Sequence, residues 1–129
     1  MNLGNMSKVA VATDSVASLP KELIDEYDIH IIPVRITVEG KVYQDTQEDL
    51  PPELIHRLQN MSQIDTTPWP PETYFQAYRK LSQKANNIIH VVCFSQFTST
   101  ISLAKRGARM AQEAIPGLNL GTRTCKPQW

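Results

Sequence analysis

The sequence lacks an excess of charge of either sign, because thirteen Lys and Arg residues balance thirteen Asp and Glu residues. A balanced chain carries no broad positive field, which argues against nucleic acid or an anionic membrane surface as a partner. Cysteine is also scarce: Cys93 and Cys125 are the two, and they form no Cys-x-x-Cys pair. Cys93 ends an apolar run, so we expect a buried thiol in a reducing compartment.

Long hydrophobic runs are absent as well. No apolar stretch is long enough to span a bilayer, and residues 1–7 lack the basic and apolar regions of a signal peptide. We therefore expect a cytoplasmic protein.

The common catalytic and cofactor motifs are missing too. There is no P-loop, no Gly-x-Gly-x-x-Gly and no Gly-x-Ser-x-Gly elbow. His30, His56 and His90 are scattered, and none has a carboxylate or cysteine partner at a metal-ligand spacing. We expect no metal and no cofactor, and interpret each histidine as a core histidine with satisfied hydrogen bonds or as a surface side chain.

What the 129 residues do contain is the composition of one globular domain, with 41% apolar and 20% charged residues. Their patterns predict strands over 8–12, 29–38, 41–43 and 88–93, with helices over 20–27, 51–61, 71–81 and 101–114. Pro33 inside the second strand indicates an edge position or a bulge. This order predicts an α/β domain with a mainly parallel sheet and flanking helices, over residues 1–121. Residues 116–121 could hold one more short strand, and we expect 122–129 to be an irregular tail.

The central stretch of the chain is an apolar strand followed by a loop dense in hydroxyl groups. The strand ends at Cys93, and the loop that follows it carries Ser95, Gln96, Thr98, Ser99 and Thr100. In an open α/β sheet, ligands sit at the carboxyl ends of the strands, and helix N-termini favour anions. The alternative is that Thr98 or Ser99 only caps the helix.

Two further loops carry hydroxyl groups. Asp14 and Ser15 follow the first strand, where they could face the same crevice or form an Asx turn. Thr66 and Thr67 lie in a proline-rich loop, which by itself is better interpreted as a surface crossover than as a binding loop. Hydroxyls and backbone N–H groups can hold a carboxylate, at about 1.5–3 kcal/mol for each charge-assisted bond. A hydrolase using Ser95 would need an adjacent base, and the sequence indicates none, so we expect a binding protein rather than an enzyme.

Four ordered motifs carry a resemblance to a known family. They are Val11-Ala12-Thr13-Asp14-Ser15 with Leu19-Pro20, residues 29–34 with Glu39-Gly40-Lys41, Asp65-Thr66-Thr67-Pro68-Trp69-Pro70, and Phe94-Ser95-Gln96-Phe97-Thr98-Ser99-Thr100. Together they resemble the N-terminal lobe of the bacterial DegV family of fatty-acid-binding proteins, over residues 8 to about 114.

The resemblance implies a fold and a function. Family members bind one long-chain fatty acid between two α/β lobes, and several present it to a partner kinase that makes an acyl phosphate. By motif position, Thr66 and Ser95 are the expected head-group ligands, Thr98 is next, and Asp14 and Ser15 line the same crevice. Family members are not enzymes by themselves.

The sequence departs from the family pattern in four ways. Asp65 stands where the family has a threonine, Trp69 replaces a small serine and Ser99 replaces a glycine, and we expect the second lobe to be absent. A lone lobe would leave an apolar face open unless it forms a homodimer or swaps a segment. The alternative function is therefore a lobe without ligand that acts as an oligomerisation or regulatory module.

Overall fold

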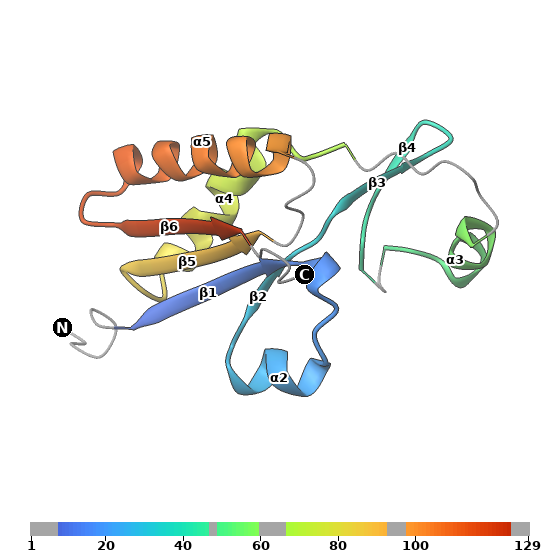
Figure 1. Ribbon diagram of the computed structural model, residues 1–129, viewed down its shortest axis with the longest axis horizontal. Coiled ribbons are helices and arrows are strands. Elements are labelled where there is room, and N and C mark those ends of the chain that lie inside the picture. Colours follow the sequence, from blue (N-terminus) through green and yellow to red (C-terminus); the bar gives the residue numbers. More distant parts are fainter. Residues whose placement is uncertain (1–7, 47–48, 60–66, 93–97, 125–129) are drawn as a thin grey trace, which may run out of the picture.

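A four-stranded sheet forms the centre of the computed structural model, which describes residues 8–46, 49–59, 67–92 and 98–124. All neighbouring strands of this sheet are parallel, and their order is β2-β1-β5-β6 (Figure 1). The strands are β1 (Val9–Asp14), β2 (His30–Ile32), β5 (Asn87–Val92) and β6 (Asn119–Thr124). The predicted α/β fold with a mainly parallel sheet is confirmed.

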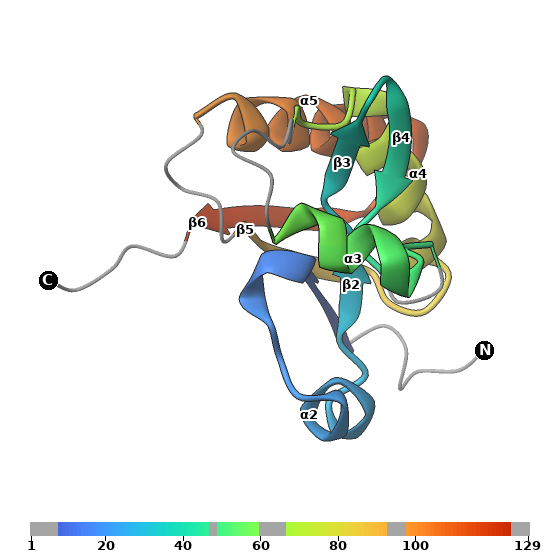
Figure 2. The same ribbon diagram turned by 90° about the vertical axis from the view of Figure 1, so that its right-hand side faces the viewer.

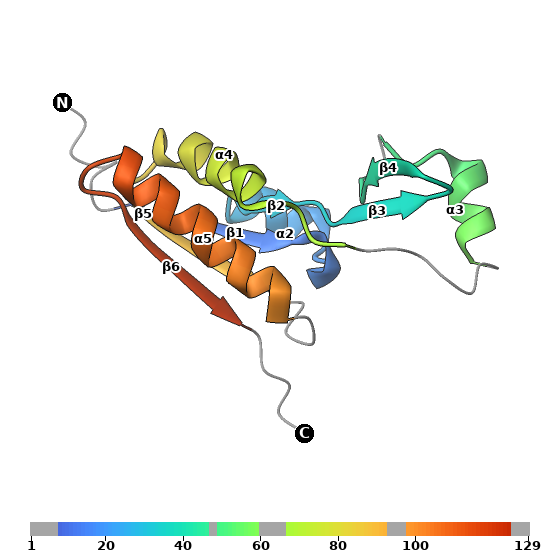
Figure 3. The same cartoon turned by 90° about the horizontal axis from the view of Figure 1, so that it is seen from above.

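Two helices, α4 (Pro71–Ser82) and α5 (Thr98–Ala114), cover one face of this sheet (Figures 1 and 3). Pro71 and Glu72 in the first turn of α4 suit a helix N-terminus. Side chains alternate along a strand, so Ala12, Ile88 and Val92 all point to the helices, where they are buried against Tyr78, Leu81, Ala104 and Ala111. This is the main hydrophobic core.

The two helices cross closely at Gly107. A Cβ atom at this position would lie 2.7 Å from the carbonyl oxygen of Pro71 and 2.7 Å from Cβ of Tyr74. Contacts this short are repulsive, so the absence of a side chain at Gly107 allows the close packing of α4 and α5.

The opposite face of the sheet keeps exposed apolar side chains. Val9 is 46% exposed and Ile89 is 41% exposed. Helix α2 (Lys21–Glu26) lies near β1 and β2, away from α5 (Figures 1 and 2), and none of its residues is buried. Parallel sheets are usually covered on both faces, so this open face is unusual.

The predicted strand over 29–38 is divided in two, which corrects our expectation. β2 ends at Ile32, and β3 (Arg35–Val38) pairs instead with β4 (Lys41–Gln44) as a separate antiparallel hairpin. Pro33 has no N–H group for a ladder, and it follows the last residue of an edge strand, as predicted. The turn has positive φ at Glu39 (51°) and Gly40 (80°), as hairpin turns of type I′ require.

The hairpin extends away from the main sheet together with α3 (Pro52–Leu58) (Figure 3). A small core of its own holds it together, in which Val38, Leu50 and Leu54 are buried. The described part of the chain thus has a main α/β body and a small hairpin extension.

The C-terminal strand differs from our expectation in length. β6 includes residues 122–124, which we expected to begin an irregular tail, and it pairs along β5 up to Thr124 and Val92. The remaining residues of that tail, 125–129, and Cys93 lie outside the described residues. Within the described ranges, no helix is both long and apolar enough to cross a membrane.

Candidate functional site

The carboxyl ends of β1 and β5 lie side by side and define the candidate site. Thr13 is paired with Val91, and the Thr13 hydroxyl donates a hydrogen bond to the Val91 carbonyl oxygen at 2.9 Å. β1 ends at Asp14 and continues into the short helix η1 (Ser15–Ala17), whereas β5 ends at Val92. Asp14 and Ser15 therefore lie at the carboxyl ends of the strands, next to the end of β5, which is the usual ligand position in such sheets.

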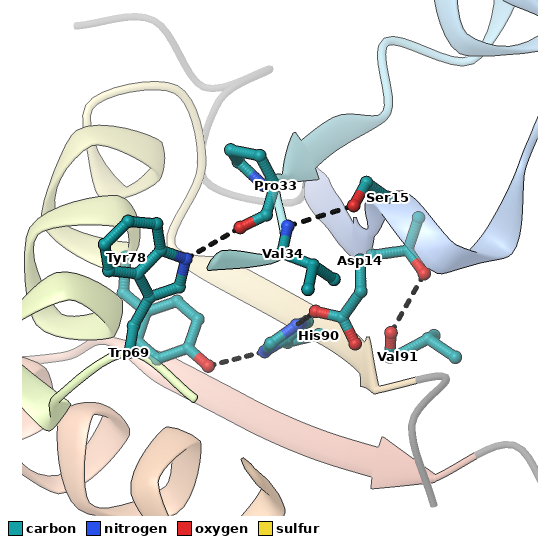
Figure 4. A network of polar contacts seen from close by, with 9 residues as sticks. Asp14, Ser15, Pro33, Val34, Trp69, Tyr78, His90 and Val91 are labelled. Atoms are coloured by element: carbon teal, nitrogen blue, oxygen red, sulfur yellow. Dashed lines mark hydrogen bonds and ion pairs between the residues drawn. The ribbon is translucent and has the colours of Figure 1, made fainter. Parts of the chain in front are cut away.

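The end of the proline-rich loop is attached to this same edge through the β2–β3 connection (Figure 4). The backbone N–H of Val34 donates to Oγ of Ser15 at 2.9 Å. The indole N–H of Trp69 donates to the Pro33 carbonyl oxygen at 2.7 Å, and Nε of Arg35 donates to the Thr67 carbonyl oxygen at 3.0 Å. Thr67 and Trp69 are therefore linked to Ser15 through three consecutive residues, Pro33, Val34 and Arg35.

The structure places the five predicted site residues unequally. Asp14 and Ser15 are described in full. Thr98 is the first residue of α5, but its side chain lies outside the described part. Thr66 and Ser95 also lie outside the described residues. The geometry at the site therefore comes from Asp14, Ser15 and their neighbours.

A buried chain of hydrogen bonds leads from the site into the core (Figure 4). Nε2 of His90 lies 3.1 Å from Oδ1 of Asp14, and Nδ1 of His90 lies 2.6 Å from the Tyr78 hydroxyl. His90 and Tyr78 are fully buried, and Asp14 is 4% exposed. A carboxylate can only accept a hydrogen bond, so the contact with Asp14 assigns a hydrogen to Nε2, and the contact at Nδ1 joins His90 to the Tyr78 hydroxyl.

This arrangement leaves His90 unsuited to act as a general base. Both ring nitrogens are already engaged, one by Asp14 and the other by Tyr78, so neither can take a proton from a serine hydroxyl. The prediction that His90 is a satisfied core histidine is confirmed. Its carboxylate partner escaped the sequence analysis because Asp14 is 76 positions away in the chain.

Two tyrosines beside His90 stay neutral over the physiological pH range. Burial, and then the negative charge of Asp14, raises the pKa of Tyr74 to about 12, although Arg35 opposes this. Burial, followed by the effects of Tyr74 and Asp14, raises the pKa of Tyr78 still further. The Tyr74 ring centre lies 6.1 Å from that of His90. The surroundings of Asp14 are therefore aromatic and poor in water.

Sequence analysis missed Arg35 as a cation near the site. Its guanidinium carbon lies 5.4 Å from the centre of the Trp69 ring, a cation–π distance, while its Nε bonds to Thr67. The available signal was a single charged residue inside the apolar run from Ile29 to Ile36.

Trp69 also lines a cavity of about 290 Å³ that reaches His30, Gln44 and Thr73. Among the described residues, no three His, Cys, Asp or Glu side chains form a group that could hold a metal ion.

Comparison with protein families and curated proteins gives consistent matches. The model of the DegV family of uncharacterised proteins matches residues 8–119. The chain is 29% identical over 110 residues to the DegV domain-containing 15.5 kDa protein of Staphylococcus aureus. The matched region covers 85% of this chain and 79% of that protein. A DegV domain-containing protein from Staphylococcus aureus (strain MRSA252) has the same identity over 110 residues, covering 85% of this chain, but there the match covers 39% of the relative.

Solved structures share the fold. A stearic-acid-binding protein from Eubacterium ventriosum superposes with a TM-score of 0.75 at 18% identity, over 89% of this chain and 40% of that chain. The Streptococcus pneumoniae fatty acid kinase (Fak) B3 protein, loaded with linoleic acid, gives a TM-score of 0.66 at 15% identity, over 90% of this chain and 41% of that chain. The chain thus spans about 40% of the solved structures it matches.

Proposed function

Because the chain belongs to the DegV family, we propose that it binds one long-chain fatty acid, with the carboxylate at the joined carboxyl ends of β1 and β5. The observation that carries this proposal is that the carboxyl ends of β1 and β5 are adjacent and that the segment before α4 is attached to the same edge. Ser15 follows β1 directly and accepts a hydrogen bond from Val34, whose neighbours Pro33 and Arg35 bond to Trp69 and Thr67. The fatty acids bound by DegV-like structures agree with such a site.

The proposed head-group ligands are hydroxyl groups. Thr66 and Ser95 donate to the carboxylate, Thr98 contributes from the first turn of α5, and Ser15 and Asp14 line the crevice. Oγ of Ser15 already accepts a hydrogen bond from Val34, so its own hydrogen can be donated to a ligand oxygen. The Arg35 guanidinium, bonded to Thr67 next to Thr66, adds positive charge near an anionic head group.

We propose further that the chain is a cytoplasmic carrier that presents the fatty acid to a fatty-acid kinase. Its likeness to the Fak B3 protein supports this role. The chain itself then performs no chemical step. The engagement of both His90 nitrogens supports this part of the proposal.

Native mass spectrometry of the purified chain tests the binding proposal. We expect uptake of oleate as a mass that is lost on denaturation. The variants Thr66→Ala and Ser95→Ala each remove a charge-assisted bond and should weaken oleate binding by roughly 10- to 150-fold. Ser102→Ala, at an exposed position of α5, is the matched control and should bind like the wild type. A wild-type chain that takes up no oleate would refute the proposal.

The open sheet face favours a second candidate function, in which the chain is an oligomerisation or regulatory module without ligand. Val9 and Ile89 are exposed on the central strands β1 and β5, where a second copy could cover them. Light scattering separates the two functions. A stable dimer that contains no lipid and becomes monomeric in Ile89→Lys supports the module. A monomer with bound oleate supports the carrier.

A further inference from the structure

The cavity of about 290 Å³ beside Trp69 lies at the edge of the main sheet that β2 forms. Its lining comes from β2, the β2–β3 connection, the end of β4, Trp69 and α4, and every lining residue belongs to the described part of the chain. None of these residues belongs to β1 or β5, so the cavity is separate from the proposed head-group site. Its volume lies near the lower end of the usual range for ligand pockets, about 300–1,000 Å³, and suits a small ligand.

Part of the cavity lining is apolar and is fixed by hydrogen bonding. Pro33, Trp69 and Ala77 contribute to this part. The indole N–H of Trp69 donates to the Pro33 carbonyl oxygen at 2.7 Å, and the guanidinium carbon of Arg35 lies 5.4 Å from the ring centre (Figure 4). An aromatic side chain held in this way favours a ligand that is itself flat and aromatic.

The polar part of the lining consists of His30, Gln44 and Thr73. Each of these side chains can donate a hydrogen bond, yet none of them has a hydrogen-bond partner among the described residues. An acyl chain would bury these groups without partners, at a cost of about 1–3 kcal/mol each. The cavity therefore favours a ligand with hydrogen-bond acceptors over the tail of a fatty acid.

The charges near His30 are mainly positive. Burial first, and then the positive charges of Lys80 and Lys84, lowers the pKa of His30 below 6.5, whereas Asp28 opposes this and His90 adds to it. Asp28 is paired with Lys84 at 3.9 Å, and no Asp or Glu is among the lining residues of the cavity. An anionic group beside His30 would therefore meet cations and no carboxylate of the lining.

The aromatic end and the cationic end of the cavity are separated along two elements. His30 and Pro33 are three residues apart in extended chain, which corresponds to about 10 Å. On α4, Thr73 and Lys80 are seven residues apart, again about 10 Å, and the helix begins on the Trp69 side. A ligand that spans this length needs an aromatic body at one end and an anionic acceptor at the other.

We propose that this cavity binds a small aromatic carboxylate, with its ring beside Trp69 and its carboxylate toward His30 and Lys80. The inference does not rest on the proposed fatty-acid function, because no residue assigned to the head group lines the cavity. The Thr73 hydroxyl and the Gln44 amide supply further donors. The Trp69 side chain thus has two roles, since it also supports the β2–β3 connection.

The test compares two ligands of the same shape, indole-3-carboxylate and the uncharged indole-3-carboxamide, by titration calorimetry. We expect the wild type to bind the carboxylate about tenfold more tightly, because hydrogen bonds to a charged acceptor are stronger. Lys80→Gln should reduce this preference roughly two- to fivefold. Thr73→Val keeps the side-chain shape but lacks the donor, and it should weaken binding of the carboxylate. Lys105→Gln, at an exposed position of α5, is the matched control and should bind both ligands like the wild type.

NMR titration of the His30 imidazole in the wild type locates the bound ligand. A carboxylate beside the ring favours its protonated form, so saturating indole-3-carboxylate should raise the pKa of His30, whereas the carboxamide should not. An unchanged His30 titration with the carboxylate bound would overturn the assignment to this cavity.

The remaining outcomes separate this inference from the proposed function. Equal affinity for carboxylate and carboxamide, or no binding of either at millimolar concentration, refutes the site. Oleate should not displace indole-3-carboxylate, and displacement would show that the cavity is part of the fatty-acid site. A chain that takes up indole-3-carboxylate as expected but no oleate refutes the proposed function alone.

Discussion

The indole N–H of Trp69 donates a hydrogen bond to the carbonyl oxygen of Pro33 at 2.7 Å, joining the segment before α4 to the point where β2 ends. Pro33 breaks the strand, and its carbonyl group would otherwise lack a partner in the main sheet. The large side chain of Trp69 therefore braces the β2–β3 connection. Arg35 lies against the same ring, so the bracing residue also places a charge near the proposed site.

We expect Trp69→Phe to destabilise the protein by about 1 kcal/mol, because the ring is kept while the hydrogen bond to Pro33 is lost. Urea unfolding followed by circular dichroism measures this change. An unchanged midpoint and slope would mean that the Pro33 carbonyl group finds an equally good partner when the indole is absent.

Gly107→Ala should destabilise the protein by about 1–3 kcal/mol. Alanine is favoured over glycine in a helix by about 1 kcal/mol, but the new methyl group would meet the backbone of Pro71 and the side chain of Tyr74 at 2.7 Å. The same unfolding measurement applies. Arg106→Ala, an exposed neighbour on α5, is the control and should change stability by less than about 0.5 kcal/mol. A more stable Gly107→Ala variant would show that the helices can separate at little cost.

Protonation of His30 should lower the free energy of unfolding of the protein in mild acid. Its pKa is lowered from 6.5 by burial first, and then by the positive charges of Lys80 and Lys84. The unfolded chain therefore binds the proton more readily, so this residue's contribution is fully present above pH 6.5 and is lost as the pH falls below 6.5 toward the lower folded value.

Thermal unfolding between pH 7.5 and 5 checks this prediction. The slope of stability against pH should show that the wild type takes up a fraction of a proton on unfolding, and this uptake should be absent in His30→Gln. The exposed His56 provides the control, and His56→Gln should keep the wild-type slope. Equal slopes in the wild type and His30→Gln would contradict the assignment.

Arg35→Gln should reduce oleate affinity roughly fivefold, because it removes a positive charge near the proposed head-group site. The oleate affinity of Arg35→Lys should lie between those of the wild type and Arg35→Gln, since lysine keeps the charge but loses the planar contact with Trp69. Arg57→Gln is the matched control: Arg57 pairs with Glu39 on the hairpin extension and should not influence binding. Titration at two salt concentrations provides the measurement, and a wild-type affinity in Arg35→Gln would exclude Arg35 from the site.

The order of the elements and the parallel sheet could be predicted from the sequence, because both follow from local patterns. Apolar runs bounded by turn residues identified β1 and β5, and the proline residues located the starts of α3 and α4. The division at Pro33 was harder to predict, since it depends on contacts with Ser15 and Trp69 that are distant in sequence. The length of β6 was missed because its residues 122–124 show no apolar alternation and are held by pairing with β5.

The candidate site was predictable only as a set of loops. Their position follows from strand ends, whereas the roles of individual side chains follow from register. Asp14 and His90 meet because β1 and β5 are adjacent and aligned, which no local pattern encodes. Arg35 was overlooked for a related reason, since a lone charge in an apolar run reveals nothing about its partners.

The position of β1 between β2 and β5 has a consequence for how the chain folds. Thr13 and Val91, which are joined by a hydrogen bond, are 78 positions apart, so the centre of the sheet depends on distant contacts. At a synthesis rate of about 5–20 residues per second, roughly 4–16 s pass between the appearance of these two residues on the ribosome. During that interval β1 waits without its central neighbour, while the hairpin can already form. We therefore expect the nascent sheet to close late, in a step that joins both ends of the chain at once.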